Sequence, residues 1–176
     1  VGSAARFAAV ADIVASRHQA EAPGAAGSTV VVVSAMSGVT NQLLSGAWAA
    51  AEGRERDYCR IKDALLERHL AVVNSLFEEG QERAQLTSWV DDRLHELERL
   101  YQSIAVLGEL TARGRDHVAA FGEQLSVHML AAALRTRGLP SRAVLATELI
   151  VTDDHFEAAQ PQMSLTRARL LERVQP

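Results

Sequence analysis

The run TVVVV at residues 29–33 constrains the fold more than any other stretch of this sequence. Its β-branched residues favour a strand, and strands are commonly of this length. The run lacks the alternation of polar and apolar residues that marks a strand with one face in water, so both of its faces should be buried. Such strands occur in parallel sheets that helices cover, and the run therefore predicts an α/β layered domain.

The rest of the chain supplies helices and further short strands for such a domain. Apolar residues at helical spacing predict helices over residues 3–19, 38–53, 115–137 and 162–174, and residues 141–147 and 148–154 are predicted as short strands. Residues 125–134 are apolar nearly all round, so this part of a helix should be buried. The order of elements indicates a mostly parallel sheet with helices on both faces.

Residues 55–104 show a different pattern, in which two amphipathic stripes are separated by a polar break at residues 78–85. The first stripe includes Leu65, His69 and Val73, and the second includes Leu86 and Leu97. Two antiparallel helices, an αα-hairpin, are the structure that this pattern predicts. His69 lies on the apolar stripe, so we expect it to be packed between helices.

Composition limits the classes of function. The chain has 176 residues, of which 48% are hydrophobic and 23% charged, as in a soluble domain with its own core. The net charge of -4 and the lack of a Lys/Arg cluster argue against a nucleic-acid surface. A single cysteine, no apolar run of about 20 residues and no signal peptide predict a cytoplasmic protein without a membrane anchor.

The loop after the valine run carries the first candidate site. Ser34, Ser37 and Thr40 offer hydroxyl groups, Gly38 permits close approach to the backbone, and a helix is predicted to start there. The unpaired N–H groups of a helix N-terminus attract anions, so this loop is a candidate anion site. The alternative is an ordinary strand–helix turn in which Ser37 caps the helix.

Two acidic segments further along are the other candidates. Glu123 stands at the entrance to the most apolar helix, where it either receives a ligand ammonium group or is an exposed glutamate near a helix start. Asp153 and Asp154 either contact a ligand or cap a turn, and no third oxygen ligand is spaced to complete a metal site. The histidines show no zinc spacing, so no metal site is predicted.

Four stretches together resemble the aspartokinases of the amino acid kinase family. They are VGSAARFAAVADIV at the start, VVVVSAMSGVTNQLL around the loop, GEQLSVHMLAAAL around Glu123, and GLPSRAVLATELIVTDDHFEAA. The resemblance covers nearly all of the chain outside residues 55–105, and it implies a three-layer amino acid kinase sandwich. Residues 1–176 would be its N-terminal, aspartate-binding part, with the helical hairpin at about 55–104 as an insertion.

The resemblance also implies a reaction. The γ-phosphoryl group of MgATP would pass to the β-carboxylate of L-aspartate, giving 4-phospho-L-aspartate for lysine, threonine and methionine biosynthesis. Ser34, Gly38 and Thr40 would hold the aspartate, Glu123 would pair with its α-ammonium group, and Asp154 would lie near the substrate. The family also implies a homo-oligomer.

Some family features are missing from the sequence. The KFGGTS motif, the second half of the domain with its nucleotide and Mg²⁺ site, and the regulatory domains have no counterpart here. We therefore expect these residues alone to be catalytically inactive, with no catalytic residue assigned among them. The alternatives are another amino acid kinase, which a comparison of aspartate with glutamate would distinguish, and a non-catalytic helical-hairpin interaction module, which requires an exposed apolar stripe on the hairpin.

Overall fold

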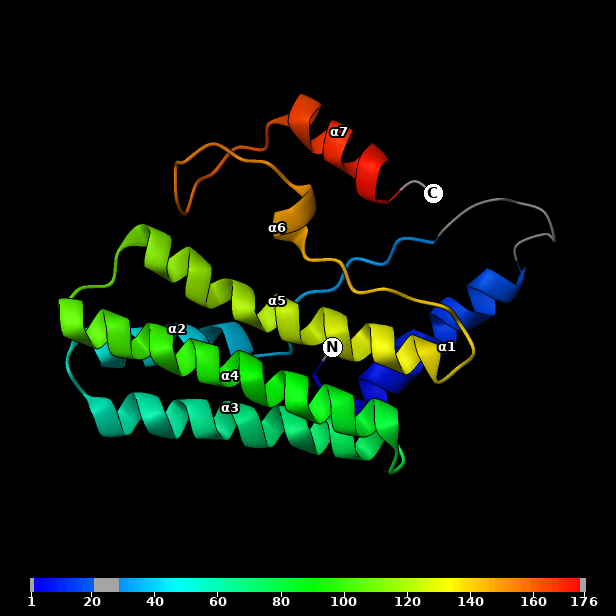
Figure 1. Ribbon diagram of the computed structural model, residues 1–176, viewed down its shortest axis with the longest axis horizontal. Helices are drawn as coiled ribbons and strands as arrows, with labels where there is room; N and C mark the ends of the chain where they lie inside the picture. Colours follow the sequence, from blue (N-terminus) through cyan, green and yellow to red (C-terminus); the bar gives the residue numbers. More distant parts are fainter. Residues whose placement is uncertain (1, 21–28, 175–176) are drawn as a thin grey trace.

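The computed structural model describes residues 2–20 and 29–174 and shows a helical bundle (Figure 1). Within these ranges the helices are α1 Ala4–Ala20, α2 Val39–Ala51, α3 Glu55–Leu76, α4 Gln81–Leu107, α5 Ala112–Arg135, α6 Ala146–Leu149 and α7 Met163–Arg173. The predicted helices are all present, with bounds within a few residues of those expected. None of the described helices is both long and apolar enough to span a bilayer.

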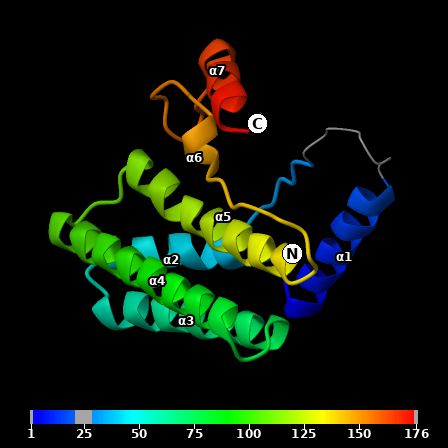
Figure 2. The same ribbon diagram turned by 45° about the vertical axis from the view of Figure 1, so that its right-hand side comes forward.

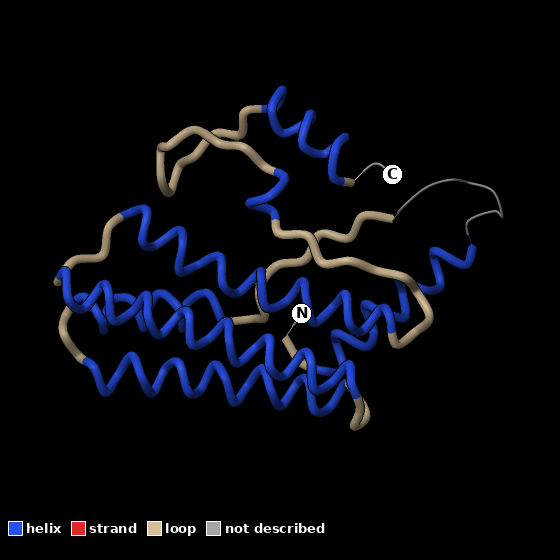
Figure 3. The backbone as a smooth tube through the Cα atoms, viewed as in Figure 1, coloured by secondary structure: helices blue, strands red, loops and turns tan. Residues whose placement is uncertain are grey.

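The predicted sheet is wrong: the described residues form no strand, as the tube in Figure 3 makes plain. Their only bridge is a single antiparallel pair, Thr152 with Pro161. The valines at residues 30–33 lead to α2 as an irregular segment, with Val32 93% exposed. A strand is stable only when neighbouring strands pair its N–H and C=O groups, and no described segment does so here. The three-layer sandwich with a mostly parallel sheet is therefore not the fold of this chain.

The two further predicted strands are also absent. Residues 140–145 are irregular, and the single-turn helix α6 takes up part of both predicted segments. Helices α6 and α7 pack on each other, and Arg173 joins them through an ion pair with Glu148 at 3.3 Å. In both views they lie on the opposite side of α5 from α3 (Figures 1 and 2).

The bundle is built around α2, which packs on α3, α4 and α5. Tyr101 of α4 is fully buried and donates a hydrogen bond to the carbonyl oxygen of Leu43 at 2.8 Å. Its ring lies directly over Gly46 of α2, where any side chain would collide with it. Residues 125–134 of α5 are largely buried, as predicted. Helix α2 is thereby fixed between two long helices.

Helices α3 and α4 occupy the region where a helical pair is predicted, and they pack along each other. His69 is fully buried, as expected, and its Nδ1 lies 2.6 Å from the carbonyl oxygen of Leu65. Within residues 55–104 no large apolar side chain is exposed. The hairpin thus lacks the exposed apolar stripe that an interaction module would require.

Candidate functional site

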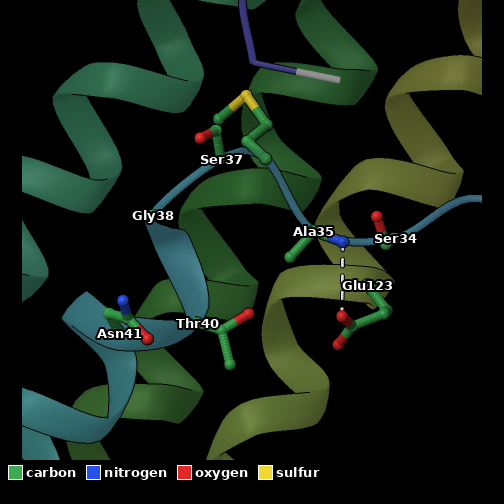
Figure 4. Close-up of a pocket in the computed structure, with 8 residues that line it drawn as sticks. Ser34, Ala35, Ser37, Gly38, Thr40, Asn41 and Glu123 are labelled. Carbon is green, nitrogen blue, oxygen red and sulfur yellow. Dashed lines mark hydrogen bonds between the residues drawn. The ribbon is translucent and has the colours of Figure 1, made fainter.

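A shallow pocket of about 280 Å³ forms where the loop before α2 meets the middle of α5 (Figure 4). The loop and the first turn of α2 contribute most of its lining, and α5 contributes Glu123. The lining residues are Ser34, Ala35, Met36, Ser37, Gly38, Thr40, Asn41 and Glu123. Two segments far apart in the sequence therefore share one pocket.

The turn at Gly38 gives one wall of the pocket its polar character. Gly38 has φ 80° and ψ -7°, a left-handed conformation that glycine adopts without strain, and it is the N-cap residue of α2. No side chain caps this helix, so the alternative role of Ser37 as N-cap is wrong. Among the described residues, the N–H groups of Thr40 and Asn41 have no acceptor. They are free to bind an anion.

Glu123 supplies the opposite charge. It lies well inside α5 rather than at the start of a helix, and its side chain is exposed. Its Oε1 accepts a hydrogen bond from the backbone N–H of Ala35 at 3.2 Å (Figure 4). Its Oε2 has no hydrogen-bond partner among the described residues, so that oxygen is available to a ligand cation.

Gly122 sets the distance between the two walls. A Cβ atom at this position would lie 2.6 Å from the Cβ of Ala35 and 3.4 Å from Cγ1 of Val39. Only a residue without a side chain lets α5 approach the loop this closely. The glycine before Glu123 is thus the reason that the carboxylate reaches the amide of Ala35.

Arg68 of α3 contacts the same loop from outside the pocket. Its Nη2 donates to the carbonyl oxygen of Ser37 at 2.9 Å, and its Nη1 donates to Oε1 of Gln42 at 3.4 Å. Sequence reasoning missed this residue, because an arginine on an amphipathic helix is normally a solvated side chain. No local signal in the sequence marks it.

The structure brings together four of the five predicted site residues: Ser34, Gly38, Thr40 and Glu123. Asp154 is not among the residues that line the pocket. It lies in the loop between α6 and α7, beside Asp153, whose Oδ1 accepts from the N–H groups of His155 and Gln160. These backbone hydrogen bonds lower the pKa of Asp153, and they give it the predicted role of a turn cap.

The loop between α6 and α7 is held against the start of α5 rather than over the pocket. Glu157 pairs with Arg115 at 2.8 Å, and its N–H donates to Oδ2 of Asp116 at 2.9 Å. In the described part of the chain, no three His, Cys, Asp or Glu side chains gather in a way that would hold a metal ion. The pocket thus combines the free N–H groups at the start of α2 with the exposed carboxylate of Glu123.

Comparison with known proteins places the chain in a family. The model of the amino acid kinase family matches residues 1–173. The chain belongs to the amino acid kinase family. The resemblance seen in the sequence is thereby confirmed at the level of the family.

The relatives of this amino acid kinase chain include plant aspartokinases. It is 34% identical over 157 residues to aspartokinase 1, chloroplastic, of Arabidopsis thaliana, covering 88% of this chain and 25% of the relative. It is 28% identical over 153 residues to the bifunctional aspartokinase/homoserine dehydrogenase 1, chloroplastic, of Zea mays, covering 87% and 16%. The chain spans about a quarter or less of the length of the curated relatives it matches.

Two solved structures of an aspartokinase superpose on this chain. E. coli aspartokinase III in complex with aspartate and ADP (R-state) superposes with a TM-score of 0.82 over 99% of this chain and 35% of that chain, at 22% identity. The same enzyme in complex with lysine and aspartate (T-state) gives 0.67 over 82% and 30%, at 21% identity. At these identities the likeness concerns the fold alone.

Proposed function

We propose that this chain forms the aspartate-binding part of an aspartate kinase. The parent reaction transfers the γ-phosphoryl group of MgATP to the β-carboxylate of L-aspartate and gives 4-phospho-L-aspartate. The observation that carries the proposal is the pocket itself, in which Glu123 faces the uncapped N-terminus of α2. The names of the plant relatives, and the aspartate and ADP bound to E. coli aspartokinase III, support the same reaction.

The two walls of the pocket match the two charges of an amino acid. The free N–H groups of Thr40 and Asn41, with the hydroxyls of Ser34 and Thr40, suit a carboxylate. Oε2 of Glu123 suits the α-ammonium group, because its partner oxygen is already bound to Ala35. A dicarboxylic acid without an amino group would lose the second of these interactions.

The proposed phosphoryl transfer requires these residues only to bind and position the aspartate. A β-carboxylate is ionised at neutral pH, so the attacking oxygen needs no general base. Catalysis of phosphoryl transfer is then a matter of position and of charge neutralisation around the phosphates. No three His, Cys, Asp or Glu side chains gather among the described residues, and we assign ATP and Mg²⁺ to other parts of the complete kinase. The present chain should bind aspartate without phosphorylating it.

Titration of this chain with L-aspartate, succinate and L-glutamate tests the proposal. Backbone amide resonances of residues 34–41 should shift with L-aspartate, and more weakly with succinate. A Glu123→Gln variant keeps an oxygen for the amide of Ala35 but replaces the other oxygen with an NH₂ group. Loss of a charge-assisted hydrogen bond is worth about 1.5–3 kcal/mol, so the Kd for L-aspartate should rise roughly 10–100-fold.

Two controls make the result specific. Succinate affinity should not fall in Glu123→Gln, because succinate has no ammonium group to lose and the substitution removes a negative charge beside a dianion. Glu79→Gln removes one carboxylate from the turn of the hairpin and should leave both affinities unchanged. Equal losses for aspartate and succinate would contradict the assigned role of Glu123, and preferential binding of L-glutamate would favour another member of the family.

A homo-oligomeric parent and a cytoplasmic location stay predictions. The plant relatives carry "chloroplastic" in their names, so the compartment is to be tested by localising the tagged full-length protein. Sedimentation of that protein tests the oligomeric state.

A further inference from the structure

We propose that Arg68 is a positioning residue of the aspartate pocket, through which the α3–α4 hairpin fixes the turn at Gly38. The predicted effect on aspartate affinity rests on the proposed function, whereas the predicted effect on the loop does not depend on any ligand. Arg68 is half-buried on α3 and does not line the pocket. It acts on the other side of the loop, through the carbonyl oxygen of Ser37 and the side chain of Gln42.

The two hydrogen bonds of Arg68 straddle the turn. Ser37 precedes Gly38, and Gln42 follows it on the first turn of α2, so one rigid guanidinium group spans both sides of the glycine. A Cβ atom at Gly38 would meet no atom within 4 Å, so no side chain packs against this side of the turn. Backbone hydrogen bonds from Val39 to Met36 at 2.9 Å and from Gln42 to Gly38 at 3.1 Å define the turn, and Arg68 acts as a clamp that restricts its conformations further from outside.

The clamp also sets the direction of a pocket amide. The peptide unit between Ser37 and Gly38 is planar and trans, so its C=O and N–H groups point in opposite directions. Because Arg68 binds the oxygen of Ser37, the N–H of Gly38 points away from Arg68. Gly38 lines the pocket, so the orientation of this peptide unit is part of the geometry that a ligand meets.

Arg68 brings a positive charge as well as two donors. It forms no ion pair with any carboxylate in the described part of the chain. Its charge therefore adds to the positive end of the α2 dipole beside the anion-binding wall. Partial burial reduces the screening of this charge by salt. Both effects favour a bound carboxylate, and neither requires Arg68 to touch it.

The variants Arg68→Met and Arg68→Lys, each measured in the present chain, separate these effects. The matched control is Arg83→Met, which removes a guanidinium group that bonds Asn74 within the hairpin at 3.0 Å. Amide hydrogen exchange of Val39 and Gln42, whose N–H groups donate to the carbonyl oxygens of Met36 and Gly38, reports the clamp without any ligand. Thermal unfolding of all three variants reports global stability, and L-aspartate titration reports the pocket.

Arg68→Met should speed exchange at Val39 and Gln42 at least tenfold relative to Arg83→Met, and should raise the Kd for L-aspartate at least tenfold. Arg68→Lys should give a similar increase in exchange, because a single ammonium group cannot span Ser37 and Gln42, but a smaller loss of affinity, because its charge remains. Exchange in Arg68→Met and Arg68→Lys that equals that of Arg83→Met would overturn the proposal, whatever the ligand data show. If the unchanged chain fails to bind L-aspartate while the exchange result holds, the clamp stands and the proposed function fails.

Discussion

The carboxylate of Glu123 accepts a hydrogen bond from the backbone N–H of Ala35. The two residues are 88 positions apart in the sequence. This bond joins α5 to the loop before α2 and closes one corner of the pocket (Figure 4). It uses one carboxylate oxygen for structure and leaves the other for a ligand. The two roles can be separated by substitution.

Replacing Glu123 by alanine should loosen the loop, whereas replacing it by glutamine should not. A hydrogen bond to a charged acceptor contributes about 1.5–3 kcal/mol, and the exposure of this carboxylate favours the lower end, so the amide of Ala35 should exchange roughly tenfold faster in Glu123→Ala. Glutamine retains an acceptor oxygen, so exchange in Glu123→Gln should stay close to that of the unchanged chain. Hydrogen exchange monitored by NMR checks both. Equal exchange rates in the two variants would show that the bond does not protect this amide.

Gly122→Ala should move the loop and destabilise the fold. The new methyl group would lie 2.6 Å from the Cβ of Ala35, so either the loop or α5 has to shift. Overpacking of this kind costs about 1–3 kcal/mol, which urea unfolding measures directly. The added Cβ at Gly80 meets no atom within 4 Å, so Gly80→Ala is the control for a glycine in open space.

The Gly122→Ala variant should also lose affinity for L-aspartate more than Gly80→Ala does, because Glu123 moves with its neighbour. A stability loss in Gly122→Ala no larger than that in Gly80→Ala would mean that the loop before α2 can move aside without a cost in free energy. The close approach would then not hold the pocket together.

His69 should make the fold less stable in mild acid. Burial lowers the pKa of His69 from 6.5 to about 4, so its neutral form is the one that the fold accommodates. Between these values the unfolded chain binds a proton that the folded chain does not, and the free energy of unfolding therefore falls as the pH falls. Between pH 7 and pH 5 the loss should be about 2 kcal/mol, with a limit of about 3 kcal/mol below pH 4.

Urea unfolding at the two pH values, with the variants His69→Gln and His95→Gln, tests this assignment. His69→Gln should remove most of the dependence on pH in this window. His95 is half exposed, so His95→Gln is the control for removing an imidazole from the surface of the hairpin. A slope that survives in His69→Gln would assign the effect to other groups.

The valines before the loop should cause self-association. Val30 and Val32 are 64% and 93% exposed, in an irregular segment that pairs with no strand in the described part of the chain. Apolar, β-branched segments with unpaired backbone groups are prone to associate with other chains. Val32→Lys should lower the apparent mass in concentration-dependent sedimentation and leave the unfolding free energy within about 0.5 kcal/mol. An unchanged mass would show that this segment takes no part in association.

The helices were predictable from the sequence because their signals are local. The apolar stripes of α3 and α4 and the burial of His69 follow from spacing alone. The strand at residues 29–33 was predicted wrongly because its β-branched residues favour an extended backbone but do not determine whether a neighbouring strand exists. Strand pairing is decided by distant residues, and the described residues supply no partner.

The pocket was predictable only in part. The hydroxyl loop and Glu123 were each ambiguous when read alone, and the resemblance to a family was needed to place them together. Gly122 and Arg68 carried no signal, because the close approach of a backbone and the direction of a long side chain are properties of packing. Asp154 followed from the resemblance, yet its loop is bound to the start of α5.

The contact between Ala35 and Gly122 restricts how this protein can diverge. Gly122 cannot gain even a methyl group unless α5 and the loop move apart, so a single substitution there disturbs the fold before it can change which ligand is bound. A lineage that changes its ligand is therefore expected to vary Thr40 or Asn41 on the α2 wall, where the pocket is open, and to leave the small pair untouched.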